Sequence, residues 1–246
     1  MKALITGASS GIGEEFARLY AAKGFDLAIV ARTKSALNRL KKDLEKKHDI
    51  AVQVVVQDLS NLSSAKKLKS KVKDVTVLIN NAGFGKKEEF EKSNYKTNQD
   101  MMLLNMVTLT NLTKLFLPDL IKNKGGIINV ASIAGFLPGP GMNVYYATKS
   151  YVLSFTEALA EELKGKVAVT CLCPGPTKTG FEEEAGTNFG NKSSSAKNVA
   201  KYGYESLKKK RVVAVHGLSY RILLALTKVF PRSWKRRISK NAVRDL

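Results

Sequence analysis

The chain has 246 residues, of which 44% are hydrophobic and 25% are charged. This length and composition are typical of one compact domain with a substantial core, and they exclude a disordered chain. The formal net charge of +20 leaves three classes of anionic partner open, namely nucleic acid, anionic lipid and an acidic substrate or cofactor.

Strand-like and helix-like segments alternate along the chain, which predicts βαβ units and a parallel sheet covered on both faces. The helix that ends before Pro118 should stop there, because proline lacks the amide hydrogen that a helix interior needs. We therefore predict an α/β fold, a doubly wound Rossmann-like three-layer sandwich with a seven-stranded parallel sheet. Residues 1–217 would form this single domain, and residues 218–246 a basic amphipathic C-terminal extension packed on or beside it. In chain order we expect a strand at 3–6, a helix at 14–23, a strand at 26–31, a helix at 34–47, a strand at 52–57, a helix at 61–71, a strand at 75–80, a helix at 98–117, a strand at 126–131, a helix at 145–163, and strands at 167–172 and 212–216.

Residues 174–196 interrupt this alternation, since they are rich in Gly, Pro, Thr, Asn and Ser. Such a composition predicts a mobile loop over a site. Apolar residues in this loop and shortly before residue 145 could line a pocket for a lipophilic ketone or aldehyde, or could simply fasten the loop. These residues are Phe136, Leu137, Pro138, Met142, Phe181 and Phe189.

A glycine-rich turn follows the first predicted strand and opens the first predicted helix. Its spacing at residues 6–13 is T-G-x-x-x-G-x-G. Glycines allow a sharp turn and let bare backbone approach a pyrophosphate, whose charge then meets the helix N-terminus. The alternative is a tight strand–helix connection without a ligand. The predicted cofactor contacts in this turn are Gly7, Ser9, Ser10, Gly11, Ile12 and Gly13.

The second predicted strand ends at Ala31 and Arg32, roughly 20 residues beyond the glycine turn. Folds that bind NAD carry an acidic residue there, which binds the ribose hydroxyls. Ala31 cannot repel a 2′-phosphate, and Arg32 can donate paired hydrogen bonds to one, assisted by Ser9 or Lys34. We therefore predict NADP(H) as the cofactor, preferred over NAD(H). The alternative role of Arg32 is to solvate the start of a helix.

Tyr145 and Lys149 are four residues apart at the start of a predicted helix, so they share one helix face. A phenol is a poor acid–base at neutral pH, but a nearby ammonium group stabilises phenolate and would lower the pKa of Tyr145. Ser132, at the end of the fifth strand, could hold a substrate oxygen. A solvated helical pair is the alternative role of Tyr145 and Lys149, and Tyr146 is expected to pack or to line the pocket.

Five motifs together resemble those of the short-chain dehydrogenase/reductase family, in the family's order and spacing over about residues 1–217. They are the turn at 6–13, Asn-Asn-Ala-Gly at 80–83, Ser132, Tyr145-x-x-x-Lys149 and Pro174-Gly175. The resemblance implies that Tyr145 protonates a carbonyl oxygen, that Ser132 orients it and that Lys149 holds the nicotinamide ribose. It also implies that Asn105 anchors a proton-relay water, the alternative being a side chain bonded to a helix carbonyl. Besides Tyr145 and Lys149, the further cofactor contacts that it implies are Asp58, Leu59, Asn81, Ala82, Gly83, Pro174, Gly175 and Thr177.

The function implied by this resemblance is an NADPH-dependent oxidoreductase that transfers hydride between nicotinamide and a carbonyl or secondary alcohol, which we expect to be lipophilic. The resemblance also implies a homodimer or homotetramer formed through the helices that contain Asn105 and Tyr145. A non-catalytic NADPH-binding regulator or scaffold on the same fold is the alternative. We expect no nucleic-acid binding, because the sequence has no zinc finger, aromatic RNA-binding motif or clear recognition helix.

The tail after residue 217 departs from the many family members that end soon after the seventh strand. Twelve basic residues follow Ser206, against Asp245 as the one acidic residue. Apolar residues fall on one face of a predicted helix, so the tail could lie on an anionic membrane surface, pack across a pocket or bind a dimer partner. The tail resembles bacterial relatives of long-chain 3-oxoacyl and 17β-hydroxysteroid reductases. Its apolar face comprises Leu218, Ile222, Ala225, Leu226 and Val229.

Three features bear on the location of the protein. The first predicted strand begins near Met1, so we expect no secretory leader. The longest apolar stretch, near residues 222–230, contains Lys228 and is too short to span a bilayer. Cys171 and Cys173 have the spacing of neither a zinc site nor a redox C-x-x-C motif, so we expect reduced buried thiols and no metal. We therefore predict a cytoplasmic protein, with the tail as a route to membrane association.

Overall fold

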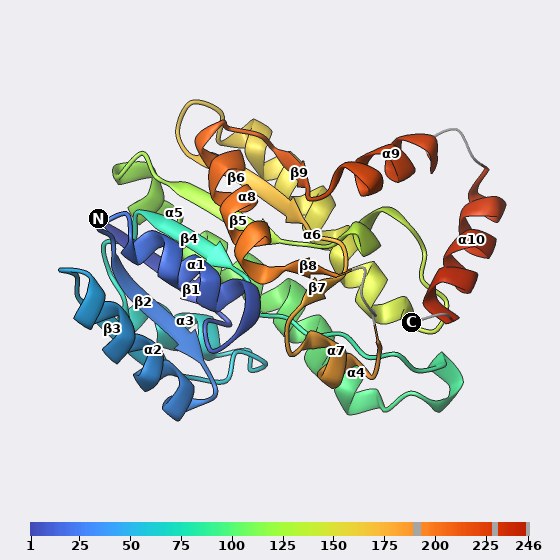
Figure 1. The fold of residues 1–246 in the computed structure, drawn as a ribbon, viewed down its shortest axis with the longest axis horizontal. Helices are drawn as coiled ribbons and strands as arrows, with labels where there is room; N and C mark the ends of the chain where they lie inside the picture. The colour runs from blue at the N-terminus through green and yellow to red at the C-terminus, as the bar shows by residue number, and fades with distance from the viewer. Residues whose placement is uncertain (189–192, 228–230, 245–246) are drawn as a thin grey trace.

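Seven parallel strands form the central sheet of the computed structural model, which describes residues 1–188, 193–227 and 231–244 (Figure 1). The strand order is β3-β2-β1-β4-β5-β6-β9, with every neighbouring pair parallel. This arrangement confirms the predicted Rossmann-like sheet. The strands are β1 (Lys2–Thr6), β2 (Asp26–Ala31), β3 (Val52–Val56), β4 (Val77–Asn80), β5 (Gly126–Val130), β6 (Ala168–Cys173) and β9 (Val213–Val215).

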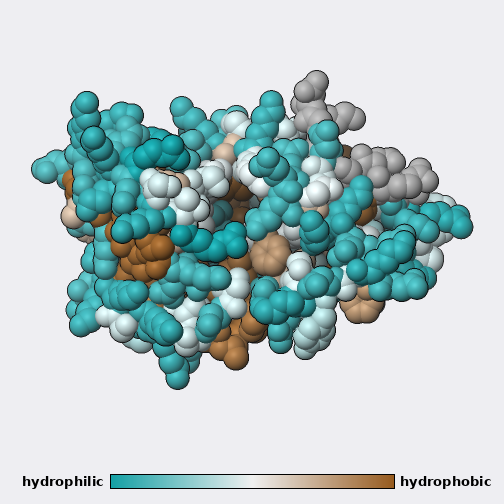
Figure 2. All heavy atoms as spheres, turned by 90° about the horizontal axis from the view of Figure 1, so that it is seen from below, coloured by the Kyte–Doolittle hydropathy of each residue, from teal (hydrophilic) through white to brown (hydrophobic). Residues whose placement is uncertain are grey.

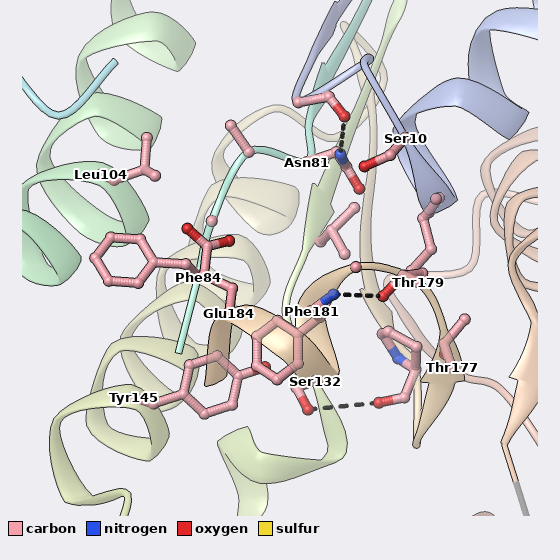
Figure 3. A pocket seen from close by; sticks show the side chains of 18 of the residues that line it. Ser10, Asn81, Phe84, Leu104, Ser132, Tyr145, Thr177, Thr179, Phe181 and Glu184 are labelled. Carbon is pink, nitrogen blue, oxygen red and sulfur yellow. Dashed lines mark hydrogen bonds between the residues drawn. The ribbon is translucent and has the colours of Figure 1, made fainter. Parts of the chain in front are cut away.

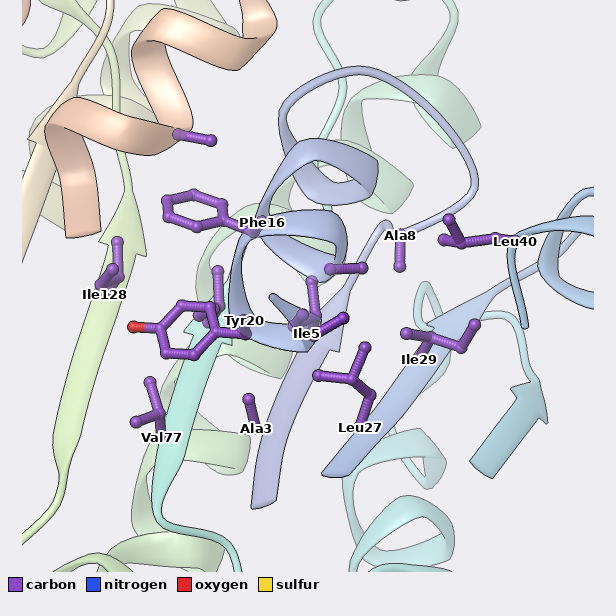
Figure 4. Close-up of a cluster of buried hydrophobic side chains, with 14 of the residues drawn as sticks. Ala3, Ile5, Ala8, Phe16, Tyr20, Leu27, Ile29, Leu40, Val77 and Ile128 are labelled. Carbon is purple, nitrogen blue, oxygen red and sulfur yellow. The ribbon is translucent and has the colours of Figure 1, made fainter. Parts of the chain in front are cut away.

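Helices cover both faces of the sheet because successive strand residues point to opposite sides. On β1, Ala3 and Ile5 pack with Phe16 and Tyr20 of α1, whereas Leu4 belongs to the cluster on the other face (Figure 4). Full burial of one such aromatic or aliphatic side chain stabilises the fold by about 1.5–3 kcal/mol. The first face carries α1 (Gly11–Ala21), α2 (Lys34–Lys47) and α8 (Ala196–Lys208), and the second carries α3 (Ser64–Lys71), α5 (Leu109–Lys122) and α6 (Asn143–Glu162).

The strand order reverses direction between β1 and β4, which are paired through Ala3–Val77 and Ile5–Ile79. The connections leaving the two strands therefore diverge to opposite faces of the sheet. A crevice opens at such a switch point, outside the carboxyl ends of the strands, and ligands bind there in open α/β sheets. The glycine-rich turn follows β1 at this edge, so the fold places that motif in the crevice.

The long helix predicted at 98–117 differs from the structure at both ends. It begins as α4 (Tyr95–Met102), continues through the π-helical segment η2 (Leu103–Thr108) and ends as α5 at Lys122. The prediction that Pro118 ends the helix is wrong, because Pro118 lies inside α5. Phe116 and Leu120, on either side of it, are fully buried. Their packing outweighs the backbone hydrogen bond that proline removes.

Residues 174–196 contain more regular structure than the predicted loop. They include a two-stranded sheet of β7 (Thr177–Lys178) and β8 (Ser194–Ser195), and the short helix α7 (Phe181–Ala185). Three glutamates follow Phe181 in the first turn of α7, where they interact favourably with the helix dipole. Gly186 ends this helix in the left-handed conformation, with φ of +68°.

The C-terminal tail forms two helices, α9 (Leu218–Thr227) and α10 (Arg232–Arg244). In α9 only Leu224 and Thr227 are buried, whereas the predicted apolar face points outward: Leu218, Ile222 and Leu226 are 69%, 53% and 55% exposed. Ala225 of that face is also exposed, and Val229 lies outside the described residues. The tail therefore presents apolar side chains on its outer surface.

The helix α10 returns to the main body, where it packs on the start of α6 (Figure 1). Val243 is buried in a cluster with Met142 and Tyr145, and Ser239 shares a hydrogen bond with Tyr146. The predicted boundary at residue 217 separates two segments that are joined by this packing.

The surface is mainly hydrophilic on the face seen in Figure 2, with hydrophobic residues gathered in separate patches. Among the residues that the structure describes, no helix combines the length and the apolar character needed to cross a bilayer.

Candidate active site

One cavity of about 350 Å³ lies at the carboxyl edge of the sheet and runs from the glycine-rich turn to Tyr145 (Figure 3). It brings together residues that lie far apart in the sequence. Gly13 and Asn105 are the two predicted site residues that do not line it. The predicted residues that line it are Gly7, Ser9, Ser10, Gly11, Ile12, Arg32, Asp58, Leu59, Asn81, Ala82, Gly83, Ser132, Tyr145, Lys149, Pro174, Gly175 and Thr177.

The glycine-rich turn depends on its glycines for backbone conformation and for close packing. Gly7 and Gly11 have φ of +66° and +58°, which other residues rarely adopt. A side chain on Gly13 would place its Cβ 2.2 Å from the carbonyl oxygen of Gly7, so Gly13 lets α1 approach the turn. The turn therefore presents bare backbone and the N-terminus of α1 to the cavity, which suits a phosphate group.

The Asn81 side chain is hydrogen-bonded to the glycine-rich turn. Its Nδ2 donates to the carbonyl oxygens of Thr6 and Gly7, at 3.0 and 3.2 Å. The Thr6 hydroxyl accepts from the backbone amides of Asn81 and Ala82, both at 3.0 Å. The Asn81 side chain thus braces the glycine-rich turn, while the residue still lines the cavity.

Arg32 lies at the rim of the cavity, directly after β2. Its guanidinium Nη2 is 3.3 Å from Oε1 of Glu184 on α7, and the two side chains are 68% and 44% exposed. Asp58, across the same end, accepts a hydrogen bond from the Ser60 amide at 2.8 Å. Sequence reasoning missed Glu184, because residues 174–196 were expected to be a loop.

Ser132, Tyr145 and Lys149 come together at the other end of the cavity. Ser132 precedes the short helix η3 (Ile133–Phe136), and its Oγ accepts from the Ala134 amide at 3.1 Å. Tyr145 and Lys149 lie one turn apart in α6, and both are buried. Nζ of Lys149 donates to the Val130 carbonyl at 2.9 Å and lies 5.8 Å from the centroid of the Tyr145 ring.

Burial is the main cause of the pKa shifts of Tyr145 and Lys149. It raises the pKa of Tyr145 above its ordinary value, and a hydrogen bond with Ser132 opposes that shift only in part. The expected lowering of the Tyr145 pKa by Lys149 is therefore wrong for this structure. Burial also lowers the pKa of Lys149 to about 8. Tyr145 is consequently a protonated phenol at neutral pH, able to donate a proton.

Asn105 lies in the π-helical segment η2 and is almost fully buried. Its Oδ1 accepts from the Phe84 amide at 3.2 Å, and its Nδ2 donates to the Phe84 carbonyl at 2.9 Å and to the Thr148 hydroxyl at 3.0 Å. The side chain thus ties the segment after β4 to the Tyr145 helix, and it is not bonded to a helix carbonyl. The role of Asn105 in holding a relay water stays a prediction.

The apolar part of the cavity includes two of the predicted pocket residues, Met142 and Phe181. The Phe181 ring lies beside the Tyr145 ring, with centroids 5.3 Å apart (Figure 3). Leu137 and Pro138 are not part of the lining, and Phe189 lies outside the described residues. Phe136 packs instead on the buried cluster that contains Cys171 and Cys173, which are free thiols. The lining residues that sequence reasoning missed include Phe84, Leu104, Thr179 and Glu184.

Known proteins share both the sequence and the fold of this chain. A family model described as short chain dehydrogenase matches residues 1–189. The very-long-chain 3-oxoacyl-CoA reductase of Pyrenophora tritici-repentis is 36% identical over 172 residues, which are 66% of this chain and 50% of that protein. The chain thus spans about half the length of that relative.

Two solved structures extend the likeness to nearly the whole chain. A short-chain dehydrogenase from Sphingobium yanoikuyae in complex with NADPH has a TM-score of 0.83 and 27% identity, and the match covers 94% of this chain and 97% of that one. A short chain dehydrogenase/reductase from Burkholderia phymatum in complex with NAD has a TM-score of 0.82 and 25% identity, with 92% of each chain covered. The family motifs and the fold agree, and the chain belongs to the short chain dehydrogenase family of oxidoreductases.

Proposed function

We propose that the protein is an NADPH-dependent reductase of lipophilic carbonyl compounds, acting also as the reverse alcohol dehydrogenase. The observation that carries this proposal is the single cavity that joins the glycine-rich turn and Arg32 to Ser132, Tyr145 and Lys149. One cavity can hold a dinucleotide and a carbonyl in contact, which removes most of the entropic barrier to their meeting.

The residues along the cavity fit an NADP(H) cofactor, which supplies or accepts the hydride. A Cβ on Gly11 would meet the Thr179 side chain at 2.7 Å, so this glycine lets Thr179 pack against the turn that would bind the phosphates. The buried Ala31 brings no negative charge to the adenosine end, and Arg32 offers a planar cation to a 2′-phosphate. Pro174, Gly175 and Thr177 line the far end, where the nicotinamide would lie next to Ser132 and Lys149.

The protein's own residues would move one proton and orient one oxygen. Ser132 would donate a hydrogen bond to the carbonyl oxygen, and the protonated Tyr145 would transfer its proton to that oxygen as hydride reaches the carbon. General-acid transfer of this kind contributes about 10²–10⁴-fold to a rate. A raised Tyr145 pKa favours the acid role, and hence the reducing direction at neutral pH. Oxidation of an alcohol would use Tyr145 in the reverse role, with its phenolate accepting the proton.

The substrate class follows from the apolar lining of the cavity, where Phe84, Met142 and Phe181 pack with Tyr145 and Leu104 lines the wall. These side chains suit an aliphatic or ring ketone better than a sugar, because they offer no hydrogen bonds to hydroxyl groups. A panel of ketones, aldehydes and 3-oxoacyl thioesters of increasing chain length tests this by consumption of NADPH. We expect the highest kcat/KM for an apolar member; a preference for hydroxylated substrates would contradict the assignment.

A second candidate role is contact of the tail with an anionic membrane surface. It is favoured by the exposed Leu218, Ile222 and Leu226 of α9, in a tail segment whose residues 218–244 contain basic but no acidic residues. Co-sedimentation with phosphatidylglycerol vesicles should fall in the double variant Ile222→Asp/Leu226→Asp and not in Leu62→Asp, which alters an exposed leucine elsewhere. Equal pelleting of all three proteins would dismiss the role. We propose a cytoplasmic location, with this contact as the route to membrane association.

Self-association is proposed through the outer surfaces of α5 and α6. Tyr151 on α6 is partly exposed, stacks on Phe155 at 5.9 Å and shares a hydrogen bond with Thr110 of α5 at 2.8 Å. Light scattering should give a dimer or tetramer for the wild type and a smaller mass for Tyr151→Lys.

The comparisons lend no support to the alternative of a non-catalytic regulator or scaffold. That alternative would be favoured only if the protein consumed no NADPH with any carbonyl compound tested.

A further inference from the structure

An ion pair closes over the adenosine end of the cavity. It joins Arg32, at the end of β2, to Glu184, on α7, although 152 positions separate the two residues in the sequence. Both side chains line the cavity. The contact therefore connects the sheet edge that would bind the adenosine ribose with the segment that covers the site.

The same short segment also covers Tyr145. Phe181, three residues before Glu184, has its ring 5.3 Å from the Tyr145 ring (Figure 3). The segment is held at its other end by the buried Ala185, whose carbonyl accepts from the Lys87 amide at 2.9 Å. One helix of five residues thus touches both the adenosine end and the reacting end of the cavity.

Glu184 conflicts with the ligand that Arg32 is suited to bind. A 2′-phosphate near Arg32 would carry negative charge into the space beside the Glu184 carboxylate. Like charges at such separations repel, and a phosphate bound by both arms of the guanidinium would compete for Nη2, the atom that contacts Glu184. Binding of the phosphate is therefore opposed by the existing ion pair.

We propose that Glu184 is a residue that sets cofactor specificity by competing with the 2′-phosphate for Arg32. Arrival of that phosphate displaces Glu184, loosens α7 and moves Phe181 off Tyr145, so the substrate site opens after NADPH has bound. A nucleotide without the 2′-phosphate leaves the ion pair and the helix α7 in place. This inference rests on the proposed use of NADPH.

Calorimetric titration with adenosine fragments tests the competition without any turnover. In Glu184→Gln, the dissociation constant of 2′,5′-ADP should fall by about two- to fivefold, as expected for loss of an exposed ion pair. That of 5′-AMP should stay unchanged. The control Glu183→Gln removes the same charge one residue away, at an exposed position that does not line the cavity, and should change neither. Equal tightening of both fragments, or none, would overturn the competition.

Arg32→Gln separates this inference from the assignment of the cofactor. It should weaken 2′,5′-ADP binding and abolish the effect of Glu184→Gln in the double variant. If Arg32→Gln leaves 2′,5′-ADP binding unchanged, the proposed NADPH preference fails. If Arg32→Gln weakens binding but Glu184→Gln has no effect, the preference stands and the competition alone fails.

Hydrogen–deuterium exchange tests the movement of α7. Saturating 2′,5′-ADP should increase the exchange of residues 181–187 in the wild type, whereas saturating 5′-AMP should not. These fragments do not reach the nicotinamide end, so they cannot reorder α7 by contacts there. In Glu184→Gln the difference between the fragments should vanish. Equal exchange with both fragments in the wild type would overturn the coupling between Arg32 and the cover.

Discussion

The floor and the cover of the cavity are built from different kinds of structure. The floor consists of strand ends, the glycine-rich turn and the first turns of α6, where Tyr145 and Lys149 are buried and Lys149 donates to the Val130 carbonyl. The cover is the five-residue helix α7, whose contact with the floor at the adenosine end is the exposed Arg32–Glu184 pair. Rigid elements hold reacting groups more accurately than short segments do. We infer that the floor performs the chemistry and the cover selects ligands.

The largest expected effect comes from the floor, at the Tyr145 hydroxyl, which would move the proton. Tyr145→Phe keeps the ring and removes the hydroxyl, so turnover should fall by about 10²–10⁴-fold or more while NADPH binding is retained. Steady-state kinetics and a binding titration measure the two effects separately. The control is Tyr146→Phe, which removes the neighbouring hydroxyl that bonds Ser239 and should keep most of the activity. Full activity of Tyr145→Phe would end the proposed mechanism.

Arg32, at the rim between floor and cover, should control the choice of cofactor. Arg32→Asp replaces a side chain that donates hydrogen bonds to phosphate by a carboxylate that can bind ribose hydroxyls. The kcat/KM with NADPH should therefore fall by about 10–100-fold, while that with NADH rises. Arg39→Asp, which makes the same charge change on α2 outside the cavity, serves as the control. An unchanged ratio of the two kcat/KM values would reject the role of Arg32.

The lowered pKa of Lys149 predicts a pH limb in the reducing direction. Lysine is charged below its pKa, so the ammonium that would hold the ribose is lost as pH rises through about 8. The kcat/KM for carbonyl reduction should be level near neutral pH and then fall by about tenfold per unit. Lys149→Arg keeps a positive charge at all these pH values and should remove this limb. The same limb in that variant would assign it to another group.

The smallest effect is expected in the cover. Phe181→Ala removes a ring that lies next to Tyr145 and leaves the side chains of Ser132 and Lys149 unchanged. We therefore expect kcat to change by no more than about threefold. The KM of bulky ketones should fall relative to that of small ones. Phe90→Ala, at an exposed position outside the cavity, is the matched control. A loss of kcat as large as that of Tyr145→Phe would show that the cover belongs to the catalytic machinery.

The floor was largely predictable from the sequence. The glycine-rich turn requires left-handed conformations at Gly7 and Gly11, and only a few folds place such a turn between a first strand and helix. Tyr145 and Lys149 share a helix face by their spacing alone. Their pKa values were not predictable, because burial outweighs the charge of a neighbouring ammonium and depends on the whole tertiary structure.

The cover and the tail were not predictable for the same reason. Residues 181–185 form only a single helical turn within a segment rich in turn residues. No local sequence pattern predicts that Glu184 contacts Arg32. The helix through Pro118 persists because the core holds Phe116 and Leu120. The periodicity of α9 grouped Leu218, Ile222 and Leu226, which are all exposed, but periodicity does not say whether such a face points inward or outward.

The central claim is that Tyr145 and a nicotinamide act together on one carbonyl group. Incubation of the protein with NADPH deuterated at the transferable position and an apolar ketone tests it directly, by mass spectrometry of the alcohol. We predict one deuterium on the carbinol carbon with the wild type and none above background with Tyr145→Phe. Bound NADPH that transfers no deuterium to any carbonyl in the panel, or equal transfer by both proteins, would contradict it.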